Sequence, residues 1–171
     1  EDVYKDGGPL SVTITEATVK DQVFEDLQLS KEPGVVQIND TTSEVTATLT
    51  ANKNFAVEGS SITYTVTLTG PAGLPIGTHA PLTFTLSDGS KITIDANSLT
   101  GKVTVPVAND VYVSAPVTNS LTGVTGDDNF EKLTLDTSPV TTKVIDLPNV
   151  VIVSIEGNGP VLENANPTFT V

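Results

Sequence analysis

The sequence predicts an all-β protein with the core of a sandwich, and three observations lead to this prediction. First, Ile62, Tyr64, Val66 and Leu68 alternate with threonines, which is the period of two expected of a strand with one buried and one exposed face. Second, Thr and Val are abundant, 13 Gly and 11 Pro residues punctuate the chain, and no long stretch has helical period. Third, hydrophobic residues make up only 37% of the chain and Trp is missing, which suits a thin core.

The alternating stretch, preceded by the acidic turn Glu58-Gly59, recurs close to the end of the chain. An alignment without gaps places Glu163 on Glu58 and Phe169 on Tyr64, about 105 residues later. A sequence that repeats at the length of a domain is typical of an array of similar domains. The chain is therefore predicted to be a tandem array.

The repeat divides the chain into three parts. Residues 1–40 are interpreted as the C-terminal part of one repeat, because Asp2-Val3-Tyr4 matches Asp110-Val111-Tyr112 and residues 10–18 match residues 117–125. The offset between matching residues drifts by a few positions, as expected for short insertions in turns. Residues 41–146 form one complete repeat. Residues 147–171 begin a third repeat, with its first strand expected at 150–155, so both terminal parts are expected to be truncated.

The complete repeat is expected to contain seven strands. Asp88-Gly89 lies between two alternating runs and predicts a hairpin. The segment from Gly126 to Pro139 is too long for a tight turn, so Phe130, Leu133 and Leu135 are expected to cap one end of the core. Seven short strands in about a hundred residues indicate an immunoglobulin-like sandwich. The expected strands are residues 45–50, 62–69, 82–86, 91–95, 102–107, 117–124 and 141–145.

The charge of the chain restricts its partners. Eight basic residues against 21 acidic ones give a net charge of −13, which disfavours nucleic acid and anionic membranes and attracts cations. No apolar run approaches the roughly 18 residues that a bilayer-spanning helix needs, so no membrane insertion is expected. The chain has no Cys, which is compatible with long bacterial surface proteins that do without disulfides.

Counting strand directions places four acidic residues at one end of the repeat. We call this the distal end, where the chain leaves the repeat, and the opposite end the proximal end. Four carboxylates close together would repel one another unless a cation neutralised them. Ca²⁺ binds six to eight oxygens from such loops, so a calcium site is predicted. The converging residues are Glu58, Asp88, Asp110 and Asp146.

The same site is expected in part in the neighbouring repeats. Asp2 and Asp40 would belong to it in the first repeat and Glu163 in the third, while Asn149 or a carbonyl near Leu147 could add an oxygen. The alternative is that these acidic residues have no common role, because Asp and Asn favour turns for local hydrogen-bonding reasons.

The remaining candidates give no catalytic site. His79 is the only histidine and is expected on a surface loop, while Asp127-Asp128 is expected to form a turn at the proximal end. With no Cys, and neither a Gly-x-Ser-x-Gly nor a His-Glu-x-x-His motif, no nucleophile and base can be paired, so the protein is not expected to be an enzyme. No Lys is marked as the donor of an isopeptide crosslink.

The order of several motifs is similar to that of the tandem repeats in large RTX-type biofilm adhesins of Gram-negative bacteria, which themselves look like Calx-β and cadherin-type modules. The resemblance covers residues 42–146 and, in part, both ends. The motifs are VEGSSITYTVTLTGPAGLP, HAPLTFTLSDG, VTVPVANDVYV, NFEKLTLD and VTTKVID.

This resemblance implies rigid extender domains with Ca²⁺ near their junctions. The Calx-β ligands fall on Glu58, Asp88, Asp110 and Asp146. The chain departs from that pattern at Asn109 and at residues 113–115, which implies fewer ions, about one per junction.

The expected function is that of an extracellular stalk module on the bacterial cell surface. Its expected partners are neighbouring repeats of the same chain and further copies of itself. Two alternatives remain: a self-assembling surface fibre, and a carbohydrate-binding module, which the lack of Trp disfavours.

Overall fold

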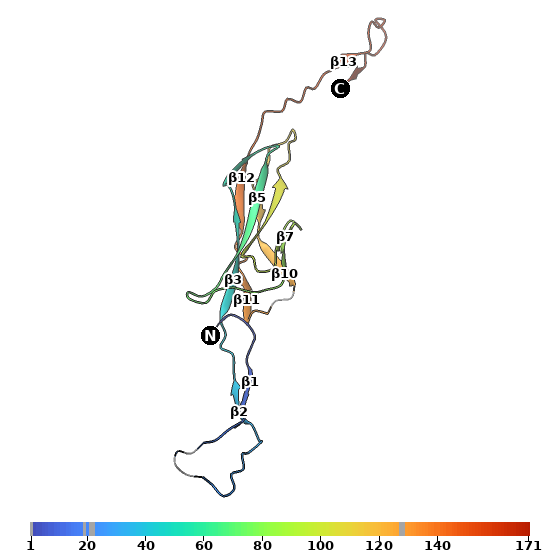
Figure 1. Ribbon diagram of the computed structural model, residues 1–171. Coiled ribbons are helices and arrows are strands. Elements are labelled where there is room, and N and C mark those ends of the chain that lie inside the picture. Colours follow the sequence, from blue (N-terminus) through green and yellow to red (C-terminus); the bar gives the residue numbers. More distant parts are fainter. Residues whose placement is uncertain (1, 19, 21–22, 127–128) are drawn as a thin grey trace.

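The structure is a computed structural model, which describes residues 2–18, 20, 23–126 and 129–171. Three parts follow one another along an extended molecule: an N-terminal hairpin, a central body and a thin C-terminal segment (Figure 1). The predicted all-β class is confirmed. The strands are β1 (Gly8–Val12), β2 (Gly34–Ile38), β3 (Glu44–Ala51), β4 (Phe55–Val57), β5 (Ser61–Thr69), β6 (Leu82–Leu86), β7 (Lys91–Ile94), β8 (Thr100–Pro106), β9 (Val117–Asn119), β10 (Leu121–Gly126), β11 (Lys132–Leu135), β12 (Val140–Ile145), β13 (Glu156–Gly157) and β14 (Phe169–Thr170).

The body is a β-sandwich. One layer is the sheet β11-β3-β5-β8, and the sheets β10-β6-β7 and β4-β12-β9 contribute to the other. Most neighbouring strands are antiparallel, but β11 pairs with β3 in parallel and β12 pairs with β4 in parallel. The chain therefore enters and leaves the body along strands that point in the same direction.

The described part of the body has more strands than the seven expected. The first predicted strand corresponds to β3, and the additional strand β4 follows after residues 52–54 and joins a different sheet. The predicted strand 117–124 is divided at Ser120 into β9 and β10. Leu133 and Leu135 belong to the additional strand β11, because their backbone pairs with β3.

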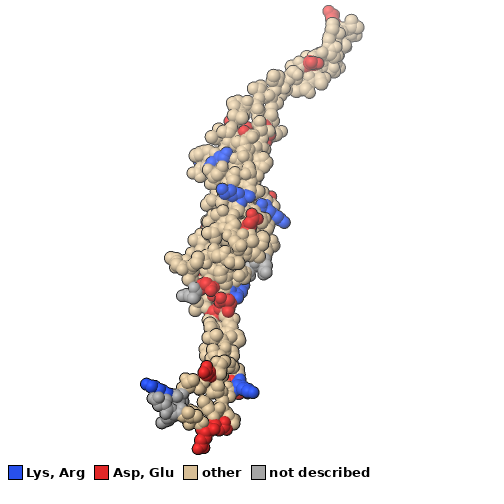
Figure 2. Space-filling model, in the orientation of Figure 1, with Lys and Arg blue, Asp and Glu red and all other residues tan. Residues whose placement is uncertain are grey.

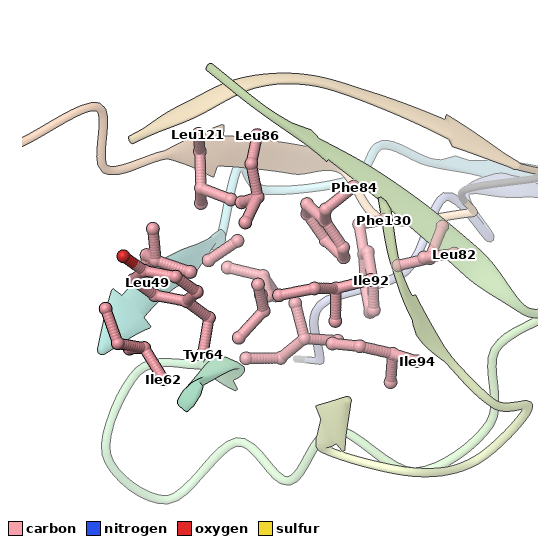
Figure 3. Packing of buried hydrophobic residues seen from close by; sticks show 14 of the residues in the cluster. Leu49, Ile62, Tyr64, Leu82, Phe84, Leu86, Ile92, Ile94, Leu121 and Phe130 are labelled. Carbon is pink, nitrogen blue, oxygen red and sulfur yellow. The ribbon is translucent and has the colours of Figure 1, made fainter. Parts of the chain in front are cut away.

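The core lies between the layers and is lined chiefly by alternate residues of β3, β5, β6 and β7 (Figure 3). Tyr64, Phe84 and Phe130 are its largest fully buried side chains. On the exposed faces, threonines pair across strands through their hydroxyls, as between Thr63 and Thr104 at 3.0 Å. These threonine pairs stabilise the exposed face of a sheet, and the packing of apolar side chains stabilises its buried face.

His79 is buried, so the expectation that it lies on the surface is wrong. Its side chain is only 3% exposed. The ring nitrogens lie 2.6 Å from the carbonyl oxygen of Ala80 and 2.7 Å from that of Ser98, and the ring is 5.8 Å from that of Phe130. Hydrogen bonds to two backbone carbonyls and contact with an aromatic ring thus stabilise His79 in a buried position at the proximal end of the body.

The C-terminal segment also differs from the expectation. Residues 150–155 form no strand, and Val150, Ile152 and Ile155 are exposed, because no strand among the described residues pairs with them. Only the two-residue strands β13 and β14 pair in this part. The described residues include no helix with the length and apolar character needed to cross a membrane.

Candidate junction sites

The parallel pairing of β4 with β12 brings two predicted residues together at the distal end of the body. Val57 lies opposite Ile145, so the next residue of each strand, Glu58 and Asp146, emerges at the same end. The backbone N–H of Glu58 also donates to the carbonyl of Ile145 at 3.1 Å. The predicted placement of these two residues at one end is therefore confirmed.

Glu58 and Asp146 share one partner, Ser114. The hydroxyl of Ser114 donates to Oε1 of Glu58 at 3.0 Å, and its backbone N–H donates to Oδ1 of Asp146 at 2.9 Å. Oε2 of Glu58 accepts from the backbone N–H of Leu147 at 2.9 Å. The Glu58 side chain is only 3% exposed, so these hydrogen bonds replace the water that an ionised carboxylate would otherwise bind.

Asp110 lies in the loop that covers this pair. Its carboxylate turns back on its own loop and accepts from the backbone N–H of Tyr112 at 2.8 Å. The amide of Asn149 donates to Oδ1 of Asn109 at 3.0 Å and also to the carbonyl of Asp110. Asn149 therefore ties the linker to this loop through its amide nitrogen, and its role as an oxygen ligand stays a prediction.

Asp88 does not join the other three. Its turn points toward the distal end, but β6 ends beside Leu121, and the neighbouring Asn119 lies opposite Val140 at the start of β12. Asp146 follows the other end of β12, about 20 Å farther along at the rise of a strand. The β6–β7 turn therefore stops well short of the distal end.

Asp88 instead forms a local network with Asn119, whose side chain is fully buried. The amide of Asn119 donates to Oδ2 of Asp88 at 2.9 Å, and the backbone N–H of Ser90 donates to Oδ1 at 2.8 Å. Burial acts to raise the pKa of Asp88, but these hydrogen bonds outweigh it and the pKa is lowered. This environment is that of a structural carboxylate.

The N-terminal part of the chain repeats the distal arrangement. The backbone N–H of Tyr4 donates to Oδ1 of Asp2 at 2.7 Å, as that of Tyr112 does to Asp110. The backbone N–H of Asp6 donates to Oδ2 of Asp40 at 3.1 Å, as that of Ser114 does to Asp146. The matching strands also pair in the same register: β1 with β2, and β9 with β12.

The N-terminal junction is the more acidic of the two. A cleft of about 260 Å³ lies where the β1–β2 hairpin joins the body, and acidic side chains gather there (Figure 2). Asp6 stands at the position that Ser114 has at the distal end, and Glu131 of the body faces the same cleft. The lining residues are Asp2, Asp6, Ile38, Asn39, Asp40, Thr41 and Glu131.

The crowding of carboxylates changes the acidity of Asp6. Repulsion from Asp2 is the main cause that raises the pKa of Asp6, followed by partial desolvation and the charges of Asp40 and Glu131. Sequence reasoning found Asp2 and Asp40 but missed Asp6 and Glu131. The match of Asp6 with Ser114 in the sequence was the available signal for the first, whereas Glu131 belongs to the body, far along the chain from Asp2 and Asp40.

The donor chemistry of this junction suits a hard cation, because carboxylate oxygens are the ligands that Ca²⁺ prefers. Among the described residues, however, no three Asp, Glu or His side chains already converge closely enough to hold an ion. Binding would therefore have to draw the carboxylates of Asp2, Asp6, Asp40 and Glu131 inward. Asp127 and Asp128, expected at this same end of the body, lie outside the described residues.

The comparison with protein families assigns the class of the protein. The model of the LapA domain, a domain named after a large biofilm adhesin, matches residues 1–41 and again residues 43–147. These matches cover most of the chain. The chain therefore belongs to the LapA domain family. Comparisons with curated proteins and with solved structures gave no match.

Proposed function

We propose that this chain is part of the stalk of a bacterial cell-surface biofilm adhesin, in which tandem repeats stiffened by Ca²⁺ hold an adhesive region away from the cell. The main support is the repeated junction: Asp2 with Asp40, and Asp110 with Asp146, have the same backbone partners at opposite ends of one body. Membership of an adhesin-related family and the extended arrangement of the parts support the same function.

The charge of the chain gives the cation a physical role. The chain has a net charge of −13, and the carboxylates within a junction repel one another, as the raised pKa of Asp6 beside Asp2 indicates for the N-terminal junction. A divalent cation would neutralise this charge and add bonds between the hairpin and the body. Ca²⁺ would thus convert a flexible connection into a stiff one.

The residues that would hold the ion differ between the two junctions. At the N-terminal junction they are Asp2, Asp6 and Asp40, with Glu131 contributed by the body. At the distal end they are Glu58, Asp110 and Asp146. Since Ser114 and Leu147 already satisfy Glu58, we expect the N-terminal junction to respond more strongly to calcium.

Small-angle X-ray scattering and thermal melting, each with Ca²⁺ and with chelator, test this proposal. We expect the maximum dimension to be larger and better defined, and the melting temperature higher, with Ca²⁺. Asp40→Asn should reduce the response, whereas Asp95→Asn, at an exposed position after β7, should not. Mg²⁺ serves as the control cation. Identical scattering profiles and melting curves under both conditions would contradict the role of calcium, and a compact particle under both would contradict the stalk.

A further inference from the structure

The N-terminal segment binds a defined surface at the proximal end of the body. We call this surface the seat; it consists of residues 129–131 and the backbone N–H groups of Gly77 and Thr78. Val3 is fully buried and belongs to the core of the body. The ring of Tyr4 stacks on that of Phe130, with centroids 5.5 Å apart and an interplanar angle of 21°. The hydroxyl of Tyr4 accepts hydrogen bonds from the backbone N–H groups of Gly77 at 2.7 Å and Thr78 at 2.9 Å.

Backbone pairing fixes the register of this contact. Tyr4 forms an antiparallel bridge with Phe130. On either side of it, the N–H of Lys5 donates to the carbonyl of Asn129 and the N–H of Glu131 donates to the carbonyl of Val3, both at 2.9 Å. The seat therefore recognises a short extended segment through its backbone, an apolar side chain and a tyrosine.

The same segment occurs a second time, uncovered, at the distal end. Val111 and Tyr112 match Val3 and Tyr4 in sequence, but their side chains are 51% and 76% exposed. The second segment already has the local turn of the first, because the N–H of Tyr112 donates to Asp110 as that of Tyr4 does to Asp2. Exposed apolar and aromatic side chains, in a segment whose counterpart packs against the body elsewhere in the chain, indicate a docking surface.

We propose that Val111 and Tyr112 dock into the seat of another copy of the repeat, residues 43–147, and so form the joint between successive repeats. The occupied contact of Val3 and Tyr4 argues for this partner, since it buries the same two residue types against this repeat's own surface. The inference rests on the proposed tandem stalk. In separate molecules of the present chain the seat is already filled, so this face does not join two of them.

In the joint, Tyr112 stacks on Phe130 of the following copy, and its hydroxyl accepts from the backbone N–H groups of Gly77 and Thr78 there. Val111 enters the following core as Val3 enters the present one. Each repeat would then complete the core of its neighbour, and these contacts would add to the stiffening that Ca²⁺ gives the same junction.

Cysteine crosslinking tests the joint, because the chain has no Cys of its own. Lys5 and Asn129 are exposed and lie on adjacent paired segments, so K5C with N129C should form a disulfide in the present chain. The matched pair is V113C, at the position equivalent to Lys5, with N129C of a following copy. It is placed in a longer chain in which a copy of residues 43–147 follows residue 147.

We expect the V113C pair to crosslink as completely as the K5C pair. L99C, at an exposed position on the β7–β8 connection, should not crosslink with the following N129C. Efficient closure of the K5C pair without closure of the V113C pair would overturn the joint. Scattering of the same longer chain tells the two proposals apart: a rod without crosslinking contradicts only the joint, whereas a compact particle contradicts the stalk itself.

Discussion

The buried carboxylate of Glu58 accepts a hydrogen bond from the backbone N–H of Leu147 at 2.9 Å, so the turn before β5 is fastened to the first residue after Asp146. Glu58→Ala would leave this N–H and the hydroxyl of Ser114 without their acceptor. We expect a loss of about 1–3 kcal/mol in the free energy of unfolding, measured with urea.

Glu58→Gln separates hydrogen bonding from charge at the same position. The amide oxygen can accept from Leu147, and the amide N–H₂ can donate to the hydroxyl of Ser114, which can also accept. We expect a smaller loss than for Glu58→Ala without calcium, and a weaker stabilisation when calcium is added. Glu44→Gln is the control, since its ion pair with Lys132 is exposed and screened by solvent, and Glu44 lies away from the distal end.

The acidic N-terminal junction predicts an unusual dependence on pH. The pKa of Asp6 is raised above 3.8, chiefly by Asp2 and then by desolvation and the charges of Asp40 and Glu131. The folded state therefore holds the proton more tightly than the unfolded state. Without calcium, this contribution to stability is full below pH 3.8 and is lost as pH rises through the folded pKa. NMR titration of the Asp6 carboxyl carbon, with and without Ca²⁺, measures the effect.

Calcium should reverse the direction of this shift, because a bound cation favours the ionised carboxylate. Asp6→Ser supplies the matched variant, as it installs the residue found at position 114. We expect it to be at least as stable as the unmodified chain without calcium and to gain less from calcium. An Asp6 titration that does not move when calcium is added would count against a cation at this junction.

Asn119 is predicted to support the β6–β7 turn. Asn119→Ala removes the amide that donates to Asp88 and accepts from Ser87, at a fully buried position. We expect a loss of about 1–3 kcal/mol near neutral pH and a rise in the pKa of Asp88. Because the pKa of Asp88 is lowered in the folded state, its contribution is present above pH 3.8 and lost as pH falls through the folded value.

The deficit of Asn119→Ala should therefore shrink in acid, which urea unfolding at a series of pH values can follow. Asn52→Ala is the control, because Asn52 is exposed and bonds the backbone N–H of Thr63 instead of a carboxylate. A deficit that is independent of pH would show that Asn119 does not act through the charge of Asp88.

Gly101 is predicted to tolerate no side chain. A Cβ atom at this position would lie 2.2 Å from the carbonyl oxygen of Thr93, a backbone atom that cannot rotate away. Gly101→Ala should cost about 1–3 kcal/mol by overpacking. Gly123→Ala is the control, since nothing lies within 4 Å of the corresponding Cβ position. Equal melting temperatures for the two variants would contradict the prediction.

The alternation of apolar and polar residues predicted the strands well, because burial of one face dictates it. Strand direction likewise predicted that Glu58 and Asp146 share an end. The direction of a strand does not determine its length, however. Asp88 was misplaced because β6 ends well short of the distal end, which β12 reaches. His79 was misplaced because the carbonyls of Ala80 and Ser98 that bury it come from loops without a sequence pattern.

Residues 150–155 show a second reason why a strand predicted from the sequence can be wrong. Their composition suits a strand, but a strand needs a neighbour to pair with, and in the described part of the chain no strand pairs with them. Glu131 was missed for a related reason: it meets Asp2, Asp6 and Asp40 only where two parts of the chain come together. A contact between segments so far apart in the sequence leaves no local pattern that could predict it.

The parallel pairing of β4 with β12 also determines how the body would respond to a lengthwise pull. Tension would draw the β3–β4 side toward one end and β12 toward the other, so the two strands would have to slide past each other. Their hydrogen bonds would be sheared together instead of being peeled apart one at a time. A body loaded in this way should rupture slowly under flow, a property governed by its rate of forced unfolding and not by its equilibrium stability.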